Sequence, residues 1–228
     1  ENRIMQEISF DPRILSLPAD IDEDSSIVSF LSGKNSVQKN YSIHVEEGKE
    51  LERTIVDFSS SSFSTEINID LEKDSSVKVS LGSLLSGKEE KIYKINVTHH
   101  EKASSSLVKR MGINSGSGHL SFLGASTIVN GAKGSSTRQE GRITNLSKEA
   151  KSEVSPSLLI KENDVKASHG ATVGAYDPKQ LFYIRSRGLS LEEAKKLITF
   201  GYFEPILAAL KDEKHIEEAK KRLGEVTL

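Results

Sequence analysis

The sequence predicts an all-β body followed by a helical tail, and it favours a solenoid of stacked strands over a β-sandwich. Three observations support this: short stretches of alternating apolar and polar residues, a weak internal repeat, and a change of composition near Asp177. All 34 serines lie before residue 191, and the chain beyond is rich in Leu, Ala, Lys and Glu. We therefore expect an N-terminal segment over 1–24, a β-rich core domain over 25–176 and a helical subdomain over 177–228.

Length, charge and cysteine content exclude several classes of protein. A chain of 228 residues predicts one domain or slightly more, with a core that needs no cross-links. The net charge is −2, from 31 basic and 33 acidic residues, and this balance argues against a nucleic-acid partner. The absence of cysteine excludes disulfides, thiolate-held clusters and cysteine nucleophiles within the chain. No stretch reaches the roughly 18 apolar residues of a membrane span, and no signal pattern opens the sequence, so we expect a cytoplasmic protein with no membrane partner.

The sequence pattern predicts strands in four segments of the body. Each alternates apolar and polar side chains with a period of two, and the links between them contain Gly, Ser, Asn, Asp and Lys, as turns do. The four segments are 41–45, 66–71, 77–81 and 91–97.

A weak repeat favours the solenoid. An aliphatic or alanine residue followed by Lys and small residues recurs at Val77–Ser80, Ala132–Ser135, Ala150–Ser152 and Val165–Ser168. The related segments Ala103–Ser106 and Gly118–Ser121 fall between them, and the spacings are then 26, 15, 14, 18 and 15 residues. A unit of about 15 residues, or about 26–30 when paired, is typical of coils that stack. Roughly five turns would then cover the body and rise about 25 Å, at ~4.8 Å between neighbouring strands. A β-sandwich also has many short strands and remains the alternative.

Capping signals predict the helices of the tail. Asp177 and Ser190 are N-cap residues, and glycine follows the first two helices at positions 188 and 201. Pro205 fits the first turn of a third helix. The expected helices are 178–187, a second from 191 to about 200, a third that contains Ile206, Leu207 and Leu210, and a charged one over about 212–223.

The segment Gly82–Glu89 nearly matches a phosphate-binding P-loop. Its last position should be Ser or Thr, whose hydroxyl holds magnesium, but here it is Glu89. A carboxylate would repel phosphate, and no helical pattern follows. We therefore predict a turn between strands.

Six histidines raise the question of a metal site. None forms a His-Glu-x-x-His or His-x-x-x-His pair. The run His99-His100-Glu101 has three potential ligands, but adjacent residues of a strand point to opposite faces. We therefore favour a solvated edge there over a ligand cluster.

His169 stands apart because only small residues surround it, in Ala167-Ser168-His169-Gly170-Ala171. Little steric cover leaves both ring nitrogens accessible to carry a proton or bind a metal. Composition alone favours the alternative of a structural histidine bonded to the backbone.

The region around His169 resembles a known family. Val165–Gly174, followed by Gln-Leu-Phe-Tyr-Ile-Arg-Ser-Arg-Gly-Leu-Ser at 180–190, closely resembles the C-terminal signature of the SufB/SufD iron–sulfur cluster assembly scaffolds. The upstream segments Gly124–Ser126, Gly141–Asn145 and Ser155–Ile160 are similar to the core of that family. The strong resemblance covers about residues 120–205.

This resemblance implies a fold and a role. The fold would be a right-handed parallel β-helix with a C-terminal helical subdomain. The chain would dimerise through the β-helix, with a SufB-like partner or with itself, and its tail would dock an ABC-type ATPase. ATP-driven rearrangement would expose the interface at which a nascent iron–sulfur cluster is built. The chain itself would be a non-catalytic scaffold, in agreement with the failed P-loop.

The motif resembles the SufD type, and that likeness implies a role for His169 in cluster assembly. The SufB type carries glutamate where this chain has Gly170, and relatives often carry cysteine where it has Ala167. Because clusters are normally held by thiolates, a partner must bring the sulfur ligands. We expect at most a transient cluster shared with that partner, with His169 as the single candidate metal ligand of this chain.

The tail supplies candidates for the ATPase contact, since aromatic and arginine side chains often anchor interfaces. The candidates are Phe182, Tyr183, Arg185, Arg187, Phe200, Tyr202 and Phe203. Packing inside the helical subdomain is the alternative for each aromatic residue. For the whole chain, the alternatives are an interaction module without cluster chemistry and a β-helix polysaccharide lyase or hydrolase. The latter would need paired carboxylates or a calcium site, and the sequence displays neither.

Overall fold

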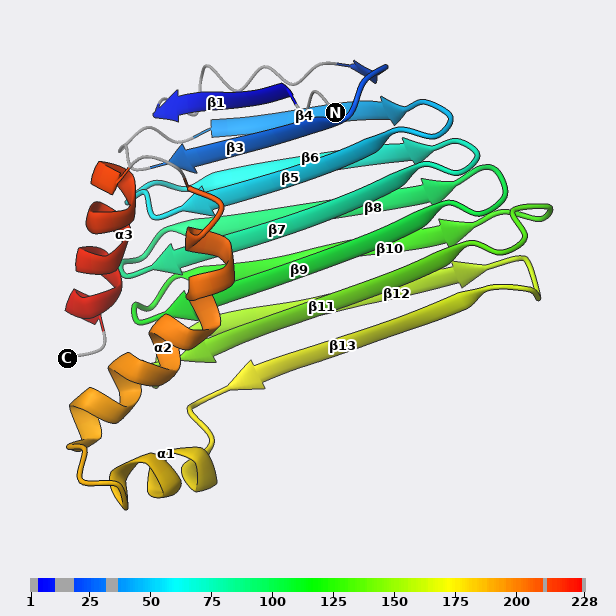
Figure 1. The fold of residues 1–228 in the computed structure, drawn as a ribbon. Helices are drawn as coiled ribbons and strands as arrows, with labels where there is room; N and C mark the ends of the chain where they lie inside the picture. Colours follow the sequence, from blue (N-terminus) through cyan, green and yellow to red (C-terminus); the bar gives the residue numbers. More distant parts are fainter. Residues whose placement is uncertain (1–3, 11–18, 32–36, 211–212, 227–228) are drawn as a thin grey trace.

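The chain forms a parallel β-solenoid of about five turns followed by three helices (Figure 1). The computed structural model describes residues 4–10, 19–31, 37–210 and 213–226. Successive strands alternate between two parallel sheets, so the odd-numbered strands form one sheet and the even-numbered strands the other. The strands are β1 (Ile4–Phe10), β2 (Asp20–Ile21), β3 (Ser25–Leu31), β4 (Val37–Val45), β5 (Glu50–Asp57), β6 (Phe63–Leu71), β7 (Ser76–Leu85), β8 (Glu90–His99), β9 (Ser105–Asn114), β10 (His119–Ile128), β11 (Ser136–Asn145), β12 (Lys151–Ile160) and β13 (Lys166–Gly174).

The strand register explains the sequence repeat and confirms the solenoid over the sandwich. Ser25 pairs with Leu51, an offset of 26 residues, and Ser105 pairs with Ser136, an offset of 31. The four predicted strands lie within β4, β6, β7 and β8. The repeated Lys-containing units lie at or just before the first residues of β7, β11, β12 and β13, where each coil begins its straight run.

Alternation along each strand fills the interior with one apolar side chain every second residue. In β6, for example, Phe63, Thr65, Ile67, Ile69 and Leu71 are buried and the residues between them are half-buried. Equivalent residues of successive coils stack in register, so each apolar side chain contacts its counterpart above and below. This ladder forms a continuous core through the coils.

The near P-loop joins two strands, as predicted. Its first residues belong to the end of β7, the turn covers residues 86–89, and β8 follows directly with no helix. A helix N-terminus that could bind phosphate is therefore missing at this segment.

The three helices are α1 (Pro178–Arg185), α2 (Leu191–Leu207) and α3 (Glu213–Val226). The Asp177 cap and the Ser190 capping box form as the sequence predicts. None of the described helices combines the length and the apolar character needed to cross a membrane.

The predicted break of the second helix at Gly201 is wrong, because α2 continues through Gly201 and Pro205 to Leu207. Glycine within a helix costs only about 1 kcal/mol. Apolar residues on both sides of Gly201, namely Ile198, Phe203 and Ile206, are buried, so packing overrides that cost. Pro205 lies so near the end of α2 that its missing N–H removes a single bond of the last turn. The start of the charged helix predicted at Asp212 lies outside the described residues.

The helices pack along one side of the stack, at the ends of the odd-numbered strands (Figure 1). Phe203 of α2 lies against Gly82 of β7, where a Cβ atom would stand 3.2 Å from the Phe203 ring and from Ile206. Phe203 also makes an edge contact with Phe58, at 5.7 Å between ring centroids. Gly82 therefore allows α2 to approach the sheet.

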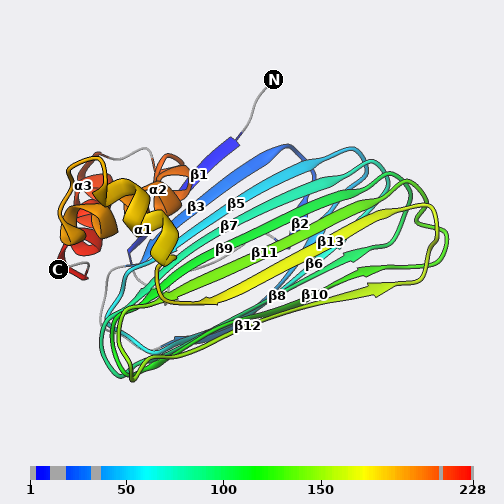
Figure 2. The same ribbon diagram turned by 90° about the horizontal axis from the view of Figure 1, so that it is seen from below.

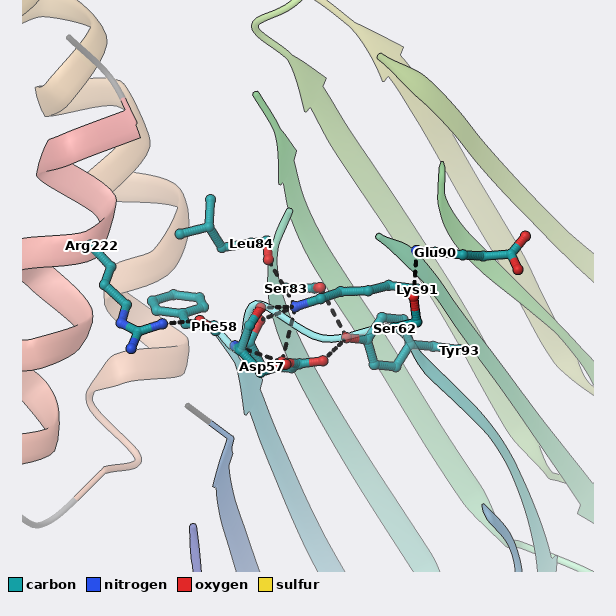
Figure 3. A network of polar contacts seen from close by, with 10 residues as sticks. Asp57, Phe58, Ser62, Ser83, Leu84, Glu90, Lys91, Tyr93 and Arg222 are labelled. Atoms are coloured by element: carbon teal, nitrogen blue, oxygen red, sulfur yellow. Dashed lines mark hydrogen bonds and ion pairs between the residues drawn. The ribbon is translucent and has the colours of Figure 1, made fainter. Parts of the chain in front are cut away.

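A buried polar network fixes the corner of the solenoid beneath α3 (Figure 3). Lys91 Nζ lies 3.0 Å from Asp57 Oδ1, and both side chains are fully buried. Lys91 also donates to the carbonyls of Ser59 and Leu84, at 2.8 and 2.9 Å, and the Tyr93 hydroxyl donates to Asp57 Oδ2. Burial lowers the pKa of the Lys91 ammonium, and the Asp57 carboxylate partly offsets this.

The same corner holds α3. Arg222 of α3 donates to the carbonyl oxygen of Phe58, the residue after Asp57. The buried ion pair thus orders a loop that contacts the helical subdomain directly, and Figure 3 shows both parts together. Removal of one member would leave an uncompensated charge in the core.

Candidate functional site

The solenoid is open at the end formed by β12 and β13, the last strands of the two sheets (Figure 2). None of the three helices covers these edges in either view. Every residue of β13 except Gly174 is exposed, and Val173 keeps 43% of its surface. A parallel strand with a bare edge retains unpaired N–H and C=O groups and can therefore pair with another chain.

The two free edges differ. Lys151, the first residue of β12, and Lys161, which follows its last residue, donate their N–H groups toward β10, so the backbone N–H groups of the even-numbered residues of β12 point to the free edge. Residue 156 is one of these positions, and it is a proline. Proline has no N–H, which interrupts the free edge of β12 at its centre. Lys166 of β13 donates toward β11, so Ala167, His169, Ala171 and Val173 present their N–H groups to the free edge. The edge of β13 is uninterrupted.

His169 lies in the middle of β13, with its side chain on the inward face. It pairs in register with Gln139 of β11, whose side chain is fully buried in the interior. The neighbouring inward residues of β13 are Ala167 and Ala171, so small side chains flank the imidazole as the sequence predicts. Because no coil covers β13, His169 itself is exposed.

A hydrogen-bonded layer lies beneath His169. Gln139 Nε2 donates to Ser126 Oγ at 2.8 Å and to the Ser157 carbonyl at 3.2 Å. Gln139 Oε1 accepts a 2.8 Å bond from Arg110, which donates through its other terminal nitrogen to the Leu123 carbonyl. The coil below the open end therefore contains a hydrogen-bonded group of buried polar side chains.

This layer continues through hydroxyl groups to His99. Ser126 Oγ accepts from Thr137 at 2.8 Å, Thr137 accepts from Ser106 at 2.7 Å, and Ser106 lies 2.9 Å from His99 Nε2. The other ring nitrogen of His99 lies 2.8 Å from Ser104 Oγ. Burial lowers the pKa of His99 to about 4, so the ring is neutral at pH 7.

The solvated edge predicted for His99-His100-Glu101 is wrong for His99. The two histidines point to opposite faces as expected, but His99 points into the core and is fully buried. His100 lies at the surface, 2.7 Å from Asp70 Oδ1. Among the described residues, no three His, Asp or Glu side chains are placed to hold a metal ion. His169 is therefore a single potential ligand without protein partners in this part of the chain.

The predicted ATPase-contact residues divide between exposed and packed positions. Phe182 and Tyr183 of α1 keep 75% and 59% of their surface, and α1 has no buried residue. Arg187 lies over the Tyr183 ring at 4.9 Å and donates to its hydroxyl at 2.6 Å. Arg185 is exposed on the same helix. We call these four exposed residues of α1 and the turn after it the α1 surface.

The three aromatic residues of α2 behave differently. Tyr202 is half-buried, with Arg142 of β11 over its ring at 5.2 Å and a 3.1 Å bond to Gln180. Phe200 is half-buried and lines an apolar groove of about 480 Å³ between α2 and α3. Phe203 is 1% exposed and packs against the solenoid, so it is inaccessible to a partner. Of these three aromatic residues, Phe200 alone lines the groove.

Comparison with known proteins shows the family to which the chain belongs. The family model described as "SUF system FeS cluster assembly, SufBD core domain" matches residues 26–202. The chain therefore belongs to the SufBD core domain family, as the resemblance implies. The matched span contains the solenoid from β3 onward, His169, α1 and most of α2.

Among individual relatives, two SufD proteins are similar to this chain. It is 36% identical over 140 residues to the iron–sulfur cluster assembly protein SufD of Bacillus subtilis, and 37% identical over 92 residues to that of Escherichia coli. These stretches cover 61% and 39% of this chain, but only 31% and 22% of the relatives. A SufBD family protein of Mycobacterium bovis is 32% identical over 106 residues, 46% of this chain and 26% of the relative. The matches thus span less than a third of each relative.

Sequence reasoning singled out His169 as a candidate but did not consider Arg110 and Gln139, which lie beneath it in the structure. Both occupy inward positions of strands, where the pattern leads one to expect aliphatic residues. A long polar residue at an inward position of a predicted strand was the available signal. This signal can be interpreted only when the strand register is known, because the register places Gln139 next to His169.

Proposed function

We propose that this chain is a SufD-like scaffold subunit of an iron–sulfur cluster assembly complex, with His169 at the assembly site. The observation that supports this best is the position of His169: central, inward-facing and accessible on the bare edge strand of the solenoid. The chain matches the SufBD core domain, and two proteins with similar sequences are named SufD. A cytoplasmic location remains a prediction.

Dimerisation through the open end is part of this proposal. The uninterrupted edge of β13 offers alternate N–H groups for pairing with a strand of a SufB-like partner or of a second copy. Such pairing would cover His169 and place it between the two chains. Because this chain has no cysteine, any thiolate ligands of the nascent cluster would come from the partner.

Docking of an ABC-type ATPase is assigned to the α1 surface. Phe182 and Tyr183 are large exposed aromatic residues, and Arg185 and Arg187 supply charge beside them. Aromatic and arginine residues of this kind anchor many interfaces. The complex would then use ATP hydrolysis by the partner, with no catalytic step in this chain.

The test of the site is anaerobic reconstitution with iron, sulfide and a cysteine-bearing SufB-like partner. We expect His169→Ala to abolish cluster formation while the complex still assembles. His100→Ala, which removes another exposed imidazole, serves as the matched control and should assemble clusters normally. Normal assembly by the His169 variant would refute the site.

The test of the docking surface is size-exclusion chromatography with light scattering after co-expression with the Suf-type ATPase of the same organism. Truncation after Tyr176 and the double substitution Phe182→Ala/Tyr183→Ala should both abolish co-elution. Leu159→Ala removes a comparably exposed apolar side chain from β12 and should leave co-elution intact. Co-elution of the Phe182→Ala/Tyr183→Ala variant with the ATPase would show that the α1 surface is not the docking contact.

A second candidate function is an interaction module that binds the ATPase but has no cluster chemistry. The absence of cysteine and the glycine at position 170 favour it. This version predicts that reconstitution with the partner does not depend on His169, so the first experiment separates the two.

A further inference from the structure

The sequence contains a single Asn-Gly pair, Asn130-Gly131, and the structure places it in the turn between β10 and β11. Both residues are exposed. Apart from its chain neighbours, no described atom lies within 4 Å of the position that a Cβ atom of Gly131 would take. Asn-Gly pairs rearrange readily, because glycine has no side chain to keep its backbone nitrogen away from the preceding side chain. Asn130 is therefore a candidate for spontaneous modification.

The rearrangement replaces one nitrogen on Asn130 Cγ by another. The backbone nitrogen of Gly131 gives up its proton and attacks Cγ, the bond from Cγ to the side-chain nitrogen breaks, and that nitrogen leaves with the proton as ammonia. The product is a five-membered succinimide ring. Water then opens the ring at one of its two carbonyl carbons. This yields either aspartate or isoaspartate, in which the main chain runs through Cβ.

The folded turn holds Asn130 in an unreactive conformation. The Ala132 N–H donates to the Val129 carbonyl at 3.2 Å, and Gly131 has a φ of +94°, so residues 129–132 form a type II turn. At the Asn130 position of such a turn, ψ is about +120°. This angle directs the Gly131 nitrogen away from the Asn130 side chain, whereas ring closure needs a ψ of the opposite sign.

Glu162, in the turn between β12 and β13, holds the reacting group. Its carboxylate accepts a 3.0 Å bond from the Gly131 N–H, and its other oxygen accepts the Asn163 N–H at 2.8 Å. These bonds, with that from Gly131 the largest cause, lower the pKa of Glu162, so the carboxylate is charged at neutral pH. The proton that Gly131 must lose is thus held in a hydrogen bond. The adjacent negative charge also opposes formation of an anionic nitrogen.

This protection depends on the last turn of the solenoid. Figure 1 shows the turns 129–135 and 161–165 on the side of the solenoid opposite the helices. Two more bonds join them: Gly134 N–H to the Asp164 carbonyl at 2.7 Å and Lys166 N–H to the Ser135 carbonyl at 3.1 Å. In the part of the chain that the structure describes, no further turn lies beyond 161–165. A terminal coil has a neighbour on one side only and opens more readily than those within the stack.

We propose that Asn130 is a self-modification site, which stays intact while the turn 161–165 is bonded to the turn 129–135 and converts to isoaspartate or aspartate when the two turns separate. Isoaspartate adds a methylene group to the main chain. The modified turn then no longer matches the turn above it, and the separation becomes permanent. The site would also become a substrate for enzymes that methylate isoaspartyl carboxylates. This inference goes beyond the scaffold function and does not depend on it.

The experiment follows Asn130 by peptide mass spectrometry while the purified full chain is incubated at neutral pH. An isoaspartyl methyltransferase with a labelled methyl donor detects the isoaspartate. The chain unfolded in guanidinium chloride gives the unprotected rate, and the folded wild type should be modified about tenfold or more slowly than this reference. Asn130→Gln identifies the signal, because glutamine cannot close the five-membered ring.

Three variants test the role of the carboxylate. Glu162→Ala removes the acceptor of the Gly131 N–H and should raise the rate of modification by about fivefold or more. Glu162→Gln keeps an oxygen acceptor without the charge and should give an intermediate rate. Glu101→Ala removes an exposed carboxylate from the neighbouring turn and should behave as wild type. Far-UV circular dichroism establishes first that each variant is folded, and the Gln variant keeps the test valid if Glu162→Ala is not.

Hydrogen exchange tests the consequence for the last coil. In wild-type chain enriched in isoaspartate, the N–H groups of Gly134 and Lys166 should exchange faster than in unmodified chain, because their bonds join the two turns. Unchanged exchange would overturn the permanent separation.

Two results would overturn the protected site itself. One is a rate in the folded wild type equal to that of the unfolded chain. The other is a rate in Glu162→Ala equal to or below that of the wild type, since the carboxylate would then leave Gly131 unprotected or act as a base toward it.

Discussion

Protonation of His99 should destabilise the protein in mild acid. The folded chain holds His99 at a pKa of about 4, mainly through burial and with a further lowering from His100, against 6.5 for the unperturbed side chain. Between these values the unfolded chain binds a proton that the folded chain does not, so the free energy of unfolding falls as pH falls. At about 1.4 kcal/mol per pH unit, the loss approaches 3 kcal/mol near pH 4.

Urea denaturation at about pH 7 and about pH 4.5 measures this loss. Carboxylates also contribute to acid sensitivity, so the informative quantity is the difference between the wild type and His99→Gln, whose side chain cannot be protonated. The variant should be less stable at neutral pH, because it makes the bonds to Ser104 and Ser106 imperfectly, but should lose much less stability in acid. His100→Gln should keep the full acid sensitivity. Equal pH dependence in the wild type and the His99 variant would refute the reasoning.

Two further substitutions probe the attachment of the helical tail. Lys91→Met should destabilise the chain by about 3–5 kcal/mol in urea denaturation, because the Asp57 carboxylate stays buried without its cation. Lys94→Met, which breaks an exposed ion pair, should cost less than about 1 kcal/mol, and similar losses from both would contradict this account. Phe203→Ala should cost about 3–5 kcal/mol and expose α2 to limited proteolysis; unchanged proteolysis would show that other contacts hold the helix.

The fold could be predicted largely from local signals. Alternation identified strands such as 66–71, and the caps at Asp177 and Ser190 located the starts of α1 and α2. The end of α2 could not be predicted in the same way. Gly201 and Pro205 are local stop signals, and they are overridden by the burial of Phe203 against Gly82, a residue more than a hundred positions earlier.

In the candidate site, too, local sequence signals identify some residues, whereas others depend on contacts between distant strands. His169 could be identified because its motif is contiguous in sequence. Arg110 and Gln139 lie on two different strands and become part of the site only through the register of β9, β11 and β13. His99 was misjudged for a related reason: strand geometry predicts that neighbours face opposite sides, but not which of the two faces inward.

Pro156 has a consequence for assembly beyond the pairing of two chains. A solenoid has two unlike ends, so copies stacked end to end in the same direction would make a heterologous contact that never closes, and a filament would grow. Continuous stacking would have to extend both sheets at once. The missing N–H of Pro156 interrupts one of them and leaves the edge of β13 available, which favours a finite complex over a fibre.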